Sequence, residues 1–208
     1  LANSIVSSRL LSRIARAHGL EHHTTLTGFK WIARAPGLGF GYEEAIGFCP
    51  DPGNVRDKDG IATSVVAASL VAALKAQGRS VWDELERLAR LHGLHVSSPL
   101  TFRVEQIEQI ASGMARLRAQ PPSVLAGSPV VEVSDLSQGY RGLPPTDGVL
   151  VLTEAGDRVI ARPSGTEPKL KCYLEVILPV AEGEPLPWEQ ARERLDAIKA
   201  AFAEIIGL

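Results

Sequence analysis

The stretch Arg162-Pro163-Ser164-Gly165-Thr166-Glu167-Pro168-Lys169 connects two apolar segments, residues 158–162 and 170–177, which are predicted to be strands. Two strands joined by a short connection rich in Gly and Pro are typical of a β-hairpin. Because further strand candidates precede this hairpin, the second half of the chain is predicted to be built on an antiparallel sheet.

The same connection has the chemistry of a phosphate site. Arg162 can grip phosphate oxygens with two parallel hydrogen bonds, and Lys169 adds a compact positive charge. The backbone N–H groups and hydroxyls of Ser164, Gly165 and Thr166 can turn toward one anion. Pro, Ser and Gly also dominate ordinary turns, so a plain hairpin turn is the alternative that the residues alone leave open.

Around the hairpin, strands and helices follow one another in an order typical of an α+β domain. The expected architecture is an antiparallel sheet backed by two helices, similar to that of the TATA-box-binding protein. Strands are predicted near 100–102, 130–133 and 148–152, helices from about 104 to 119 and from 188 to 206, and an exposed loop at 136–146.

The first half of the chain is predicted to be an α/β domain, a mixed sheet flanked by helices. A strand at 3–6 leads into a helix that Ser7 or Ser8 can cap, and the longest helical pattern runs over 60–77 with Asp59 as its N-cap. A second helix is predicted at 81–92. We therefore expect two domains, residues 1–96 and 97–208.

Composition narrows the possible functions. Of 208 residues, 45% are hydrophobic and 22% are charged, which is typical of a soluble globular protein, and we expect no membrane span. A formal net charge of −2 gives no electrostatic reason to expect nucleic acid or a membrane surface as a partner. Cys49 and Cys172 stand far apart without zinc-ligand spacing, so we expect no metal site, reduced thiols and a cytoplasmic location.

Two further groups of residues are candidates for ligand binding. Lys30 follows a turn, Thr27-Gly28-Phe29, and could project into a cleft, although most lysines cover surface. Glu43 and Glu44 are adjacent carboxylates beside glycines and aromatics, a setting that suits hydrogen bonds to vicinal sugar hydroxyls. A polar hairpin turn is the alternative reading of these two residues.

Taken together, four motifs in this order resemble the α-D-phosphohexomutase family, which includes phosphoglucomutases and phosphomannomutases. The motifs are Thr27-Gly28-Phe29-Lys30, Gly41-Tyr42-Glu43-Glu44-Ala45-Ile46-Gly47, Asp57-Lys58-Asp59-Gly60-Ile61 and the stretch of residues 162–169.

The resemblance implies a chain that is only part of its enzyme. Family members have four domains, and this chain is similar to the third and fourth, so the missing first and second domains would be its partners. Nothing here resembles the family loop whose serine carries the phosphoryl group, or the aspartate-rich loop that binds Mg²⁺. In the full enzyme, hexose 1-phosphate and hexose 6-phosphate interconvert through a hexose 1,6-bisphosphate, and this chain alone is expected to be inactive.

The resemblance also suggests a role for each candidate residue. A phosphosugar would bind with its non-reacting phosphate on the 162–169 stretch and its hydroxyls on the sugar loop, while Lys30 would act in acid–base or electrostatic catalysis. Ala45-Ile46-Gly47 replaces the Ser-Gly-His of many members and is similar to the phosphopentomutase branch. The residues implied are Glu43, Glu44 and Ala45 for the sugar, and Arg162, Ser164, Gly165, Thr166 and Lys169 for the phosphate.

Two other functions compete with this one. Because the phosphoserine and metal loops are missing, a stand-alone, non-catalytic module that binds a sugar phosphate or a protein is the main alternative. Nucleic-acid binding by the sheet of the second domain is a weaker one, because basic and aromatic residues are not interleaved.

Overall fold

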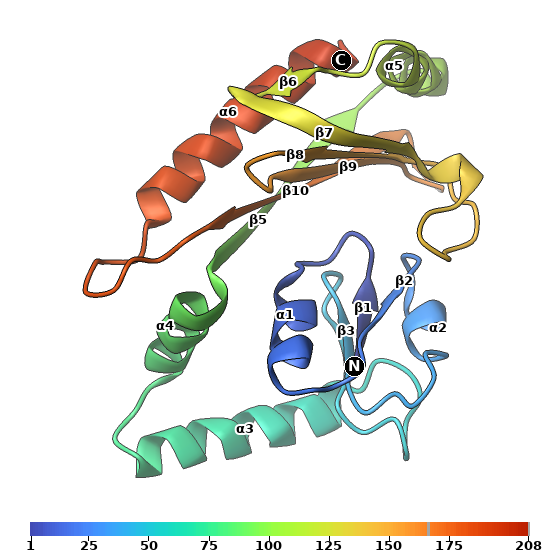
Figure 1. Ribbon diagram of the computed structural model, residues 1–208. Coiled ribbons are helices and arrows are strands. Elements are labelled where there is room, and N and C mark those ends of the chain that lie inside the picture. The colour runs from blue at the N-terminus through green and yellow to red at the C-terminus, as the bar shows by residue number, and fades with distance from the viewer. Residues whose placement is uncertain (166, 208) are drawn as a thin grey trace. The chain divides into compact units, whose positions relative to one another are not determined.

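The computed structural model describes residues 1–165 and 167–207, which form two compact units (Figure 1). The first unit contains Leu1–Leu94 and Pro179–Leu186, and the second contains His95–Leu178 and the segment from Pro187 onward. The fold predicted from the sequence, an α/β part followed by an α+β part, is confirmed.

The first unit is built on a four-stranded mixed sheet in the order β2-β1-β3-β4. β1 pairs in parallel with β2 and with β3, and β3 pairs antiparallel with β4. Because β1, β2 and β3 run in the same direction, the segments that leave their carboxyl ends begin at the same edge of the sheet. The strands are β1 (Ala2–Ser4), β2 (His23–Thr25), β3 (Gly41–Glu43) and β4 (Gly47–Cys49).

Four helices accompany this sheet: α1 (Leu10–Ala17), α2 (Phe29–Ile32), α3 (Gly60–Ala76) and α4 (Val81–His92). The Asp59 carboxylate accepts a hydrogen bond from the Ala62 N–H at 2.9 Å, so the predicted N-cap of the longest helix is confirmed. The α2 side chains help to form the core. That core consists of Ala2, Phe29, Ile32, Ala33, Ala35, Leu38 and Cys49.

The segment Pro179–Leu186 lies far along the chain but packs with the first unit. The Arg90 guanidinium on α4 donates to the carbonyl oxygens of Ala181 and Glu184, at 3.3 and 3.0 Å. These bonds tie the segment to α4 and explain why it groups with the first unit.

The surface of α3 and α4 is unusually apolar. The structure describes every residue of α3, and Leu74 is the only one of them that is buried. No single helix in the described parts of the chain is long and apolar enough to cross a membrane, while α3 and α4 pass this test only as a pair bent by 90°. The exposed apolar residues are Ile61, Val65, Val66, Leu70 and Val71 on α3 and Val81, Trp82, Leu85 and Leu91 on α4.

The second unit is built on a six-stranded sheet in the order β5-β10-β9-β8-β7-β6, and the pairs from β10 to β6 are antiparallel. Two helices, α5 (Ile107–Ala119) and α6 (Trp188–Ile206), pack on one face of this sheet (Figure 1). The strands are β5 (Leu94–Arg103), β6 (Val124–Leu125), β7 (Ser128–Asp135), β8 (Val149–Thr153), β9 (Arg158–Pro163) and β10 (Lys169–Leu178).

The two faces of β10 have different roles. One face carries buried apolar residues toward the helices, which supply the buried side chains of Leu195, Ile198 and Phe202 from α6. The other face carries polar and charged side chains, because successive residues of a strand point to opposite sides. The apolar set of β10 is Leu170, Cys172, Leu174, Val176 and Leu178, and the polar face includes Lys171 and Glu175.

Three predictions in the second half need correction. The strand predicted near 100–102 is the end of a longer strand, β5, which begins at Leu94. The short strand β6 is present although the pattern did not predict it. Residues 136–146 are not wholly exposed, because Leu136 is buried within a short 3₁₀-helix, Leu136–Gln138, and its carbonyl accepts the Thr146 N–H at 2.9 Å.

Candidate functional site

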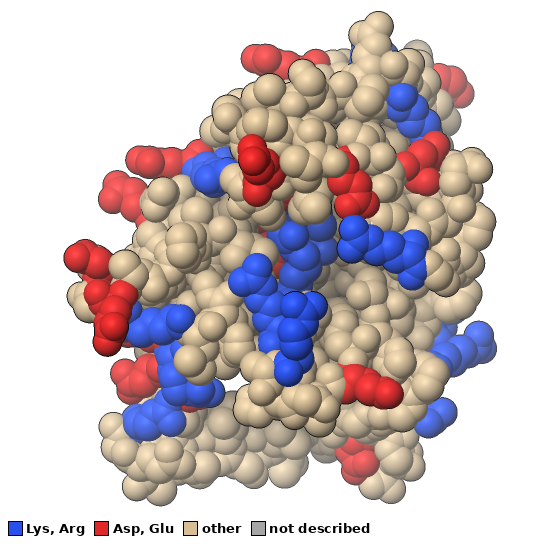
Figure 2. All heavy atoms as spheres, viewed as in Figure 1, with Lys and Arg blue, Asp and Glu red and all other residues tan. Residues whose placement is uncertain are grey.

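The root of the β9–β10 hairpin places two cations side by side. In the antiparallel register Arg162 of β9 lies directly opposite Lys171 of β10. Opposed residues of an antiparallel pair project from the same face, where two like charges repel each other. An anion bound between them would remove that repulsion, so this pair is the strongest structural signal for a phosphate in the second unit. Figure 2 shows Lys and Arg side chains gathered near the middle of the face in view.

Sequence reasoning did not single out Lys171, although its position could have been found by counting. Arg162 precedes the connection and Lys171 follows it, and pairing the two predicted strands from the turn outward brings them opposite one another. Arg103, the last residue of β5, is a third cation near the hairpin. Its proximity is seen in the pKa of Glu167, which is lowered mainly by Lys169 and further by the charges of Arg103 and Lys171.

Within the hairpin connection, several polar groups already bind each other. The Ser164 N–H donates to the Lys169 carbonyl oxygen at 2.8 Å and so closes the hairpin. Because this N–H is already used, the group that Ser164 offers to a ligand is its hydroxyl. The Lys169 ammonium lies 2.6 Å from a Glu167 carboxylate oxygen, and this hydrogen bond lowers the pKa of Glu167. Gly165 is exposed, and Thr166 lies outside the described residues.

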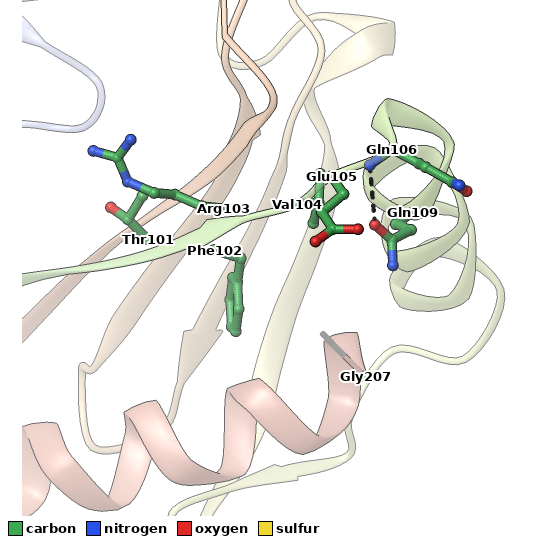
Figure 3. Close-up of a pocket in the computed structure, with 8 residues that line it drawn as sticks. All are labelled: Thr101, Phe102, Arg103, Val104, Glu105, Gln106, Gln109 and Gly207. Atoms are coloured by element: carbon green, nitrogen blue, oxygen red, sulfur yellow. Dashed lines mark hydrogen bonds between the residues drawn. The ribbon is translucent and has the colours of Figure 1, made fainter.

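A pocket of about 660 Å³ lies beside this hairpin, at the end of β5 and the start of α5 (Figure 3). The Val104 N–H donates to the Pro168 carbonyl oxygen at 3.1 Å, which ties the end of β5 to the connection. Figure 3 shows Phe102 pointing toward α6 while Arg103 points away to the other side of the strand. Because a carboxylate and two amide side chains line the pocket, it suits a phosphate less well than the face with Arg162. Those side chains are Glu105, Gln106 and Gln109.

In the first unit, Glu43 is held at the end of β3 by a lysine that the sequence analysis did not single out. Its carboxylate side chain is 9% exposed, and Oε1 lies 3.3 Å from the Lys58 ammonium. The same ammonium lies 5.2 Å from the centre of the Phe29 ring. Lys30, by contrast, is exposed, and its ammonium lies 5.7 Å from the Trp31 ring centre.

Glu44 has a different partner from its neighbour. The Ser7 hydroxyl donates to Glu44 Oε2 at 2.9 Å, and Ser7 is itself 2.9 Å from the Ser4 hydroxyl. Since Ser7 belongs to the segment that leaves β1, this bond joins two of the segments at the carboxyl edge of the sheet. Ala45 and Ile46 follow at the exposed tip, and Ile46 adopts a positive φ of 53°, which is costly for a β-branched residue.

The candidate residues are divided between the two units. Glu43, Glu44, Ala45 and Lys30 belong to the first unit, with Lys58 and Ser7 as added members. The residues from Arg162 to Lys169 belong to the second unit, with Lys171 and Arg103 as added members.

Comparison with known proteins identifies the class. Residues 1–91 match the family model for phosphoglucomutase/phosphomannomutase alpha/beta/alpha domain III, and residues 101–205 match that for the phosphoglucomutase/phosphomannomutase C-terminal domain. The chain belongs to the phosphoglucomutase/phosphomannomutase family. The resemblance stated from the four sequence motifs is thereby confirmed.

Particular relatives show how much of such a protein is present. The chain is 42% identical to a "Probable phosphomannomutase" of Haemophilus influenzae over 84% of its length, and 30% identical to a mouse phosphopentomutase over 98%. It spans 36% of the length of each of these curated relatives. The solved structure of parafusin, a phosphoglucomutase from Paramecium, covers the whole chain with a TM-score of 0.70 at 19% identity, and the chain covers 38% of it.

Proposed function

We propose that this chain forms the sugar-binding and phosphate-binding part of a mutase that interconverts hexose 1-phosphate and hexose 6-phosphate. The observation that carries the proposal is the pair Arg162 and Lys171, two cations opposed on one sheet face, with Ser164 two residues after Arg162. Two cations and a hydroxyl can neutralise and orient a phosphate, with Arg162 supplying two parallel hydrogen bonds. The family relationship supplies the reaction class.

In this proposal the phosphate on the hairpin is the one that does not react. A phosphoserine elsewhere in the protein gives its phosphoryl group to the free end of the sugar, and the resulting bisphosphate turns round and returns the other group. Each phosphate in turn must then fit Arg162, Ser164 and Gly165. Lys169 can join them while it stays paired with Glu167, because its ammonium has three N–H donors and this pair uses one of them.

The first unit would hold the sugar ring in either orientation. Glu43 would accept hydrogen bonds from hydroxyls that both orientations display, and Glu44 and Ala45 would form the tip of the same loop. Lys30 is exposed on α2, as required of a side chain that meets a substrate, and we propose an acid–base or electrostatic role for it. The phosphopentomutase relative makes a pentose phosphate a second substrate class to test.

The described residues of this chain contain no cluster of side chains that could serve as a Mg²⁺ site. In residues 1–165 and 167–207, no three His, Cys, Asp or Glu side chains are grouped so that they could hold a metal ion. The proposal therefore places both the Mg²⁺ site and the phosphoserine in the rest of the protein, with hexose 1,6-bisphosphate as intermediate. Cys49 and Cys172 are buried free thiols, which supports a cytoplasmic location.

The rest of the protein also needs a surface on which to pack. Nine large apolar side chains of α3 and α4 are exposed, and a contiguous exposed apolar surface often marks a protein–protein contact. Since the chain spans 36% of the length of its relatives, we propose that the remaining two domains cover this surface. A dye that fluoresces on apolar surfaces should bind the 208-residue chain strongly and the full-length protein weakly, and equal binding would contradict this contact.

The activity is tested by ³¹P NMR of the full-length protein with glucose 1-phosphate, followed by mannose, glucosamine and ribose phosphates. We expect the 1-phosphate signal to give way to the signal of the terminal phosphate for at least one sugar, and Arg162→Gln to slow this conversion by two or more orders of magnitude. The 208-residue chain alone should convert none. Binding without conversion by the full-length protein would instead favour a non-catalytic sugar-phosphate-binding module.

A further inference from the structure

Ile46 is unfavourable in this structure in two independent ways. Its φ of 53° lies in the left-handed region, which is strained for a β-branched residue, and it is 87% exposed to solvent. A glycine at this position would remove both costs. A single exposed apolar residue needs no explanation, but a strained residue that gains so little from packing points to a role outside the fold.

The strain arises from the short connection between β3 and β4. Glu43 and Gly47 are register partners, so only residues 44–46 are left to reverse the chain. A three-residue hairpin connection commonly places its last residue in the left-handed region, where glycine is preferred. Ile46 is that last residue.

The connection is also tied to the segment that leaves β1. The Ser7 hydroxyl donates its one proton to Glu44 Oε2 at 2.9 Å, so the Ser4 hydroxyl, 2.9 Å from that of Ser7, must donate to Ser7. Ser4 and Ser7 are both buried. Because these bonds hold the start of the connection and strand pairing holds its end, the backbone has little freedom to relieve the strain at Ile46.

We propose that Ile46 is a further sugar-contacting residue, which packs against a C–H face of the ring. Glu43 and Ile46 lie at the two ends of one tight connection, so a hydroxyl acceptor and an apolar group are close neighbours. A pyranose matches this arrangement, because hydroxyls project from its edge while C–H groups cover its faces, and ligand sites generally combine apolar contacts with a few polar groups. Contact with the sugar would cover the exposed side chain and offset the strain of its backbone. This inference rests on the proposed function, because it adds an apolar contact to the sugar half of the site.

The test compares stability with binding in the 208-residue chain, because strain that is retained for a ligand predicts opposite changes in the two. Ile46→Gly removes both the strain and the side chain, Ile46→Asn tolerates the left-handed region but is polar, and Ile46→Val keeps the strain with a shorter apolar side chain. Ala126→Gly is the matched control, because Ala126 also has a positive φ, 47°, but lies between β6 and β7 in the second unit.

Hydrogen exchange measures the stability of each unit, and ¹⁵N NMR titrations measure the binding of glucose 6-phosphate and, separately, of inorganic phosphate. Glucose 6-phosphate is the probe because the hydroxyls of its β-pyranose ring are all equatorial, so that both faces of the ring present C–H groups. Sugar binding is followed at the amides of Glu43 and Gly47, and phosphate binding at those of Ser164 and Gly165.

We expect Ile46→Gly and Ile46→Asn to slow hydrogen exchange in the first unit, because the backbone is no longer strained. The same two variants should raise the Kd for glucose 6-phosphate about tenfold, and Ile46→Val about fourfold, as for the loss of one apolar CH₂ contact. Ala126→Gly should slow exchange in the second unit and leave both affinities unchanged. The affinity for inorganic phosphate should be the same in all variants.

The assignment of Ile46 is overturned if Ile46→Gly and Ile46→Asn bind glucose 6-phosphate as tightly as the wild type. It is also overturned if they destabilise the first unit, because Ile46 would then serve the fold, or if they weaken binding of inorganic phosphate equally. A wild-type titration in which glucose 6-phosphate shifts the amides of Ser164 and Gly165 but not those of Glu43 and Gly47 would have the same consequence. A wild-type chain that binds neither ligand would instead overturn the proposed function itself, and the assignment of Ile46 with it.

Discussion

A buried charge cluster in the second unit gives a prediction whose magnitude follows from the structure. Glu175 of β10 lies between His95 and Arg158, with its Oε1 3.1 Å from His95 Nδ1 and its Oε2 3.3 Å from Arg158 Nη2. The side chains of His95 and Glu175 are 1% exposed and that of Arg158 is 8% exposed. Glu175→Gln would remove the only negative charge of this triad and leave the Arg158 charge buried.

Removing one partner of a buried ion pair costs about 3–5 kcal/mol, mostly because the other charge loses its compensation. Glu175→Gln should therefore lower the free energy of unfolding of the second unit by about that amount. The double variant Arg158→Met with Glu175→Gln should recover most of the loss, because it removes the buried Arg158 charge together with the carboxylate that faces it. Hydrogen exchange of the β9 and β10 amides measures the unfolding of this unit separately from the first.

The comparison between the single and double variants shows whether the loss of stability comes from the buried charge of Arg158. If Glu175→Gln costs less than about 1 kcal/mol, the charges are not buried as the distances and exposures indicate. If the double variant is as unstable as the single one, the loss does not come from an uncompensated charge on Arg158, and the reasoning is refuted.

Three further predictions concern other parts of the chain. Gly47→Ala should lower the free energy of unfolding by about 1–3 kcal/mol in urea melts, because the added Cβ would lie 2.7 Å from Lys58 Cδ, whereas Gly39→Ala, with open space around it, should be nearly neutral. Burial raises the pKa of Cys172 to about 12, so this thiol should stay unreactive toward thiol reagents at pH 8 until the protein unfolds; rapid labelling of the native chain would contradict this. Hydrogen bonds from its arginine partners lower the pKa of Glu84 from 4.5 to about 2, so the stability it provides is present above pH 4.5 and is lost as the pH falls toward 2. Glu84→Gln should flatten the pH dependence of the melting temperature in that window, and an unchanged acid slope would count against the ion pair.

The helices were predictable because their signals are local. The apolar spacing over 81–92 and 188–206 predicts α4 and α6 with the bounds that the structure shows, and Asp59 marks the start of α3. The beginning of β5 was not predictable in this way. His95 and the serines after it are polar, and the partner that makes a buried His95 favourable, Glu175, comes 80 residues later.

In the candidate site, too, features with a local sequence signal were predictable and features that depend on distant partners were not. Residues 162–169 could be singled out from the sequence because one short segment carries several groups that suit a phosphate. Lys171 required a register, and Lys58 required the tertiary contact that places the segment before α3 against β4. The engagement of the Ser164 amide within its own hairpin was also invisible in the sequence, since the geometry of the turn decides which N–H groups point outward.

The most direct test of the account is whether the hairpin binds phosphate, measured by ¹⁵N NMR titration of the 208-residue chain with inorganic phosphate. We predict that the amides of Ser164 and Gly165 shift and saturate in the millimolar range, about −4 kcal/mol, and that Arg162→Gln abolishes the shifts. If these amides do not move at tens of millimolar phosphate, or if they move equally in Arg162→Gln, the phosphate assignment is contradicted.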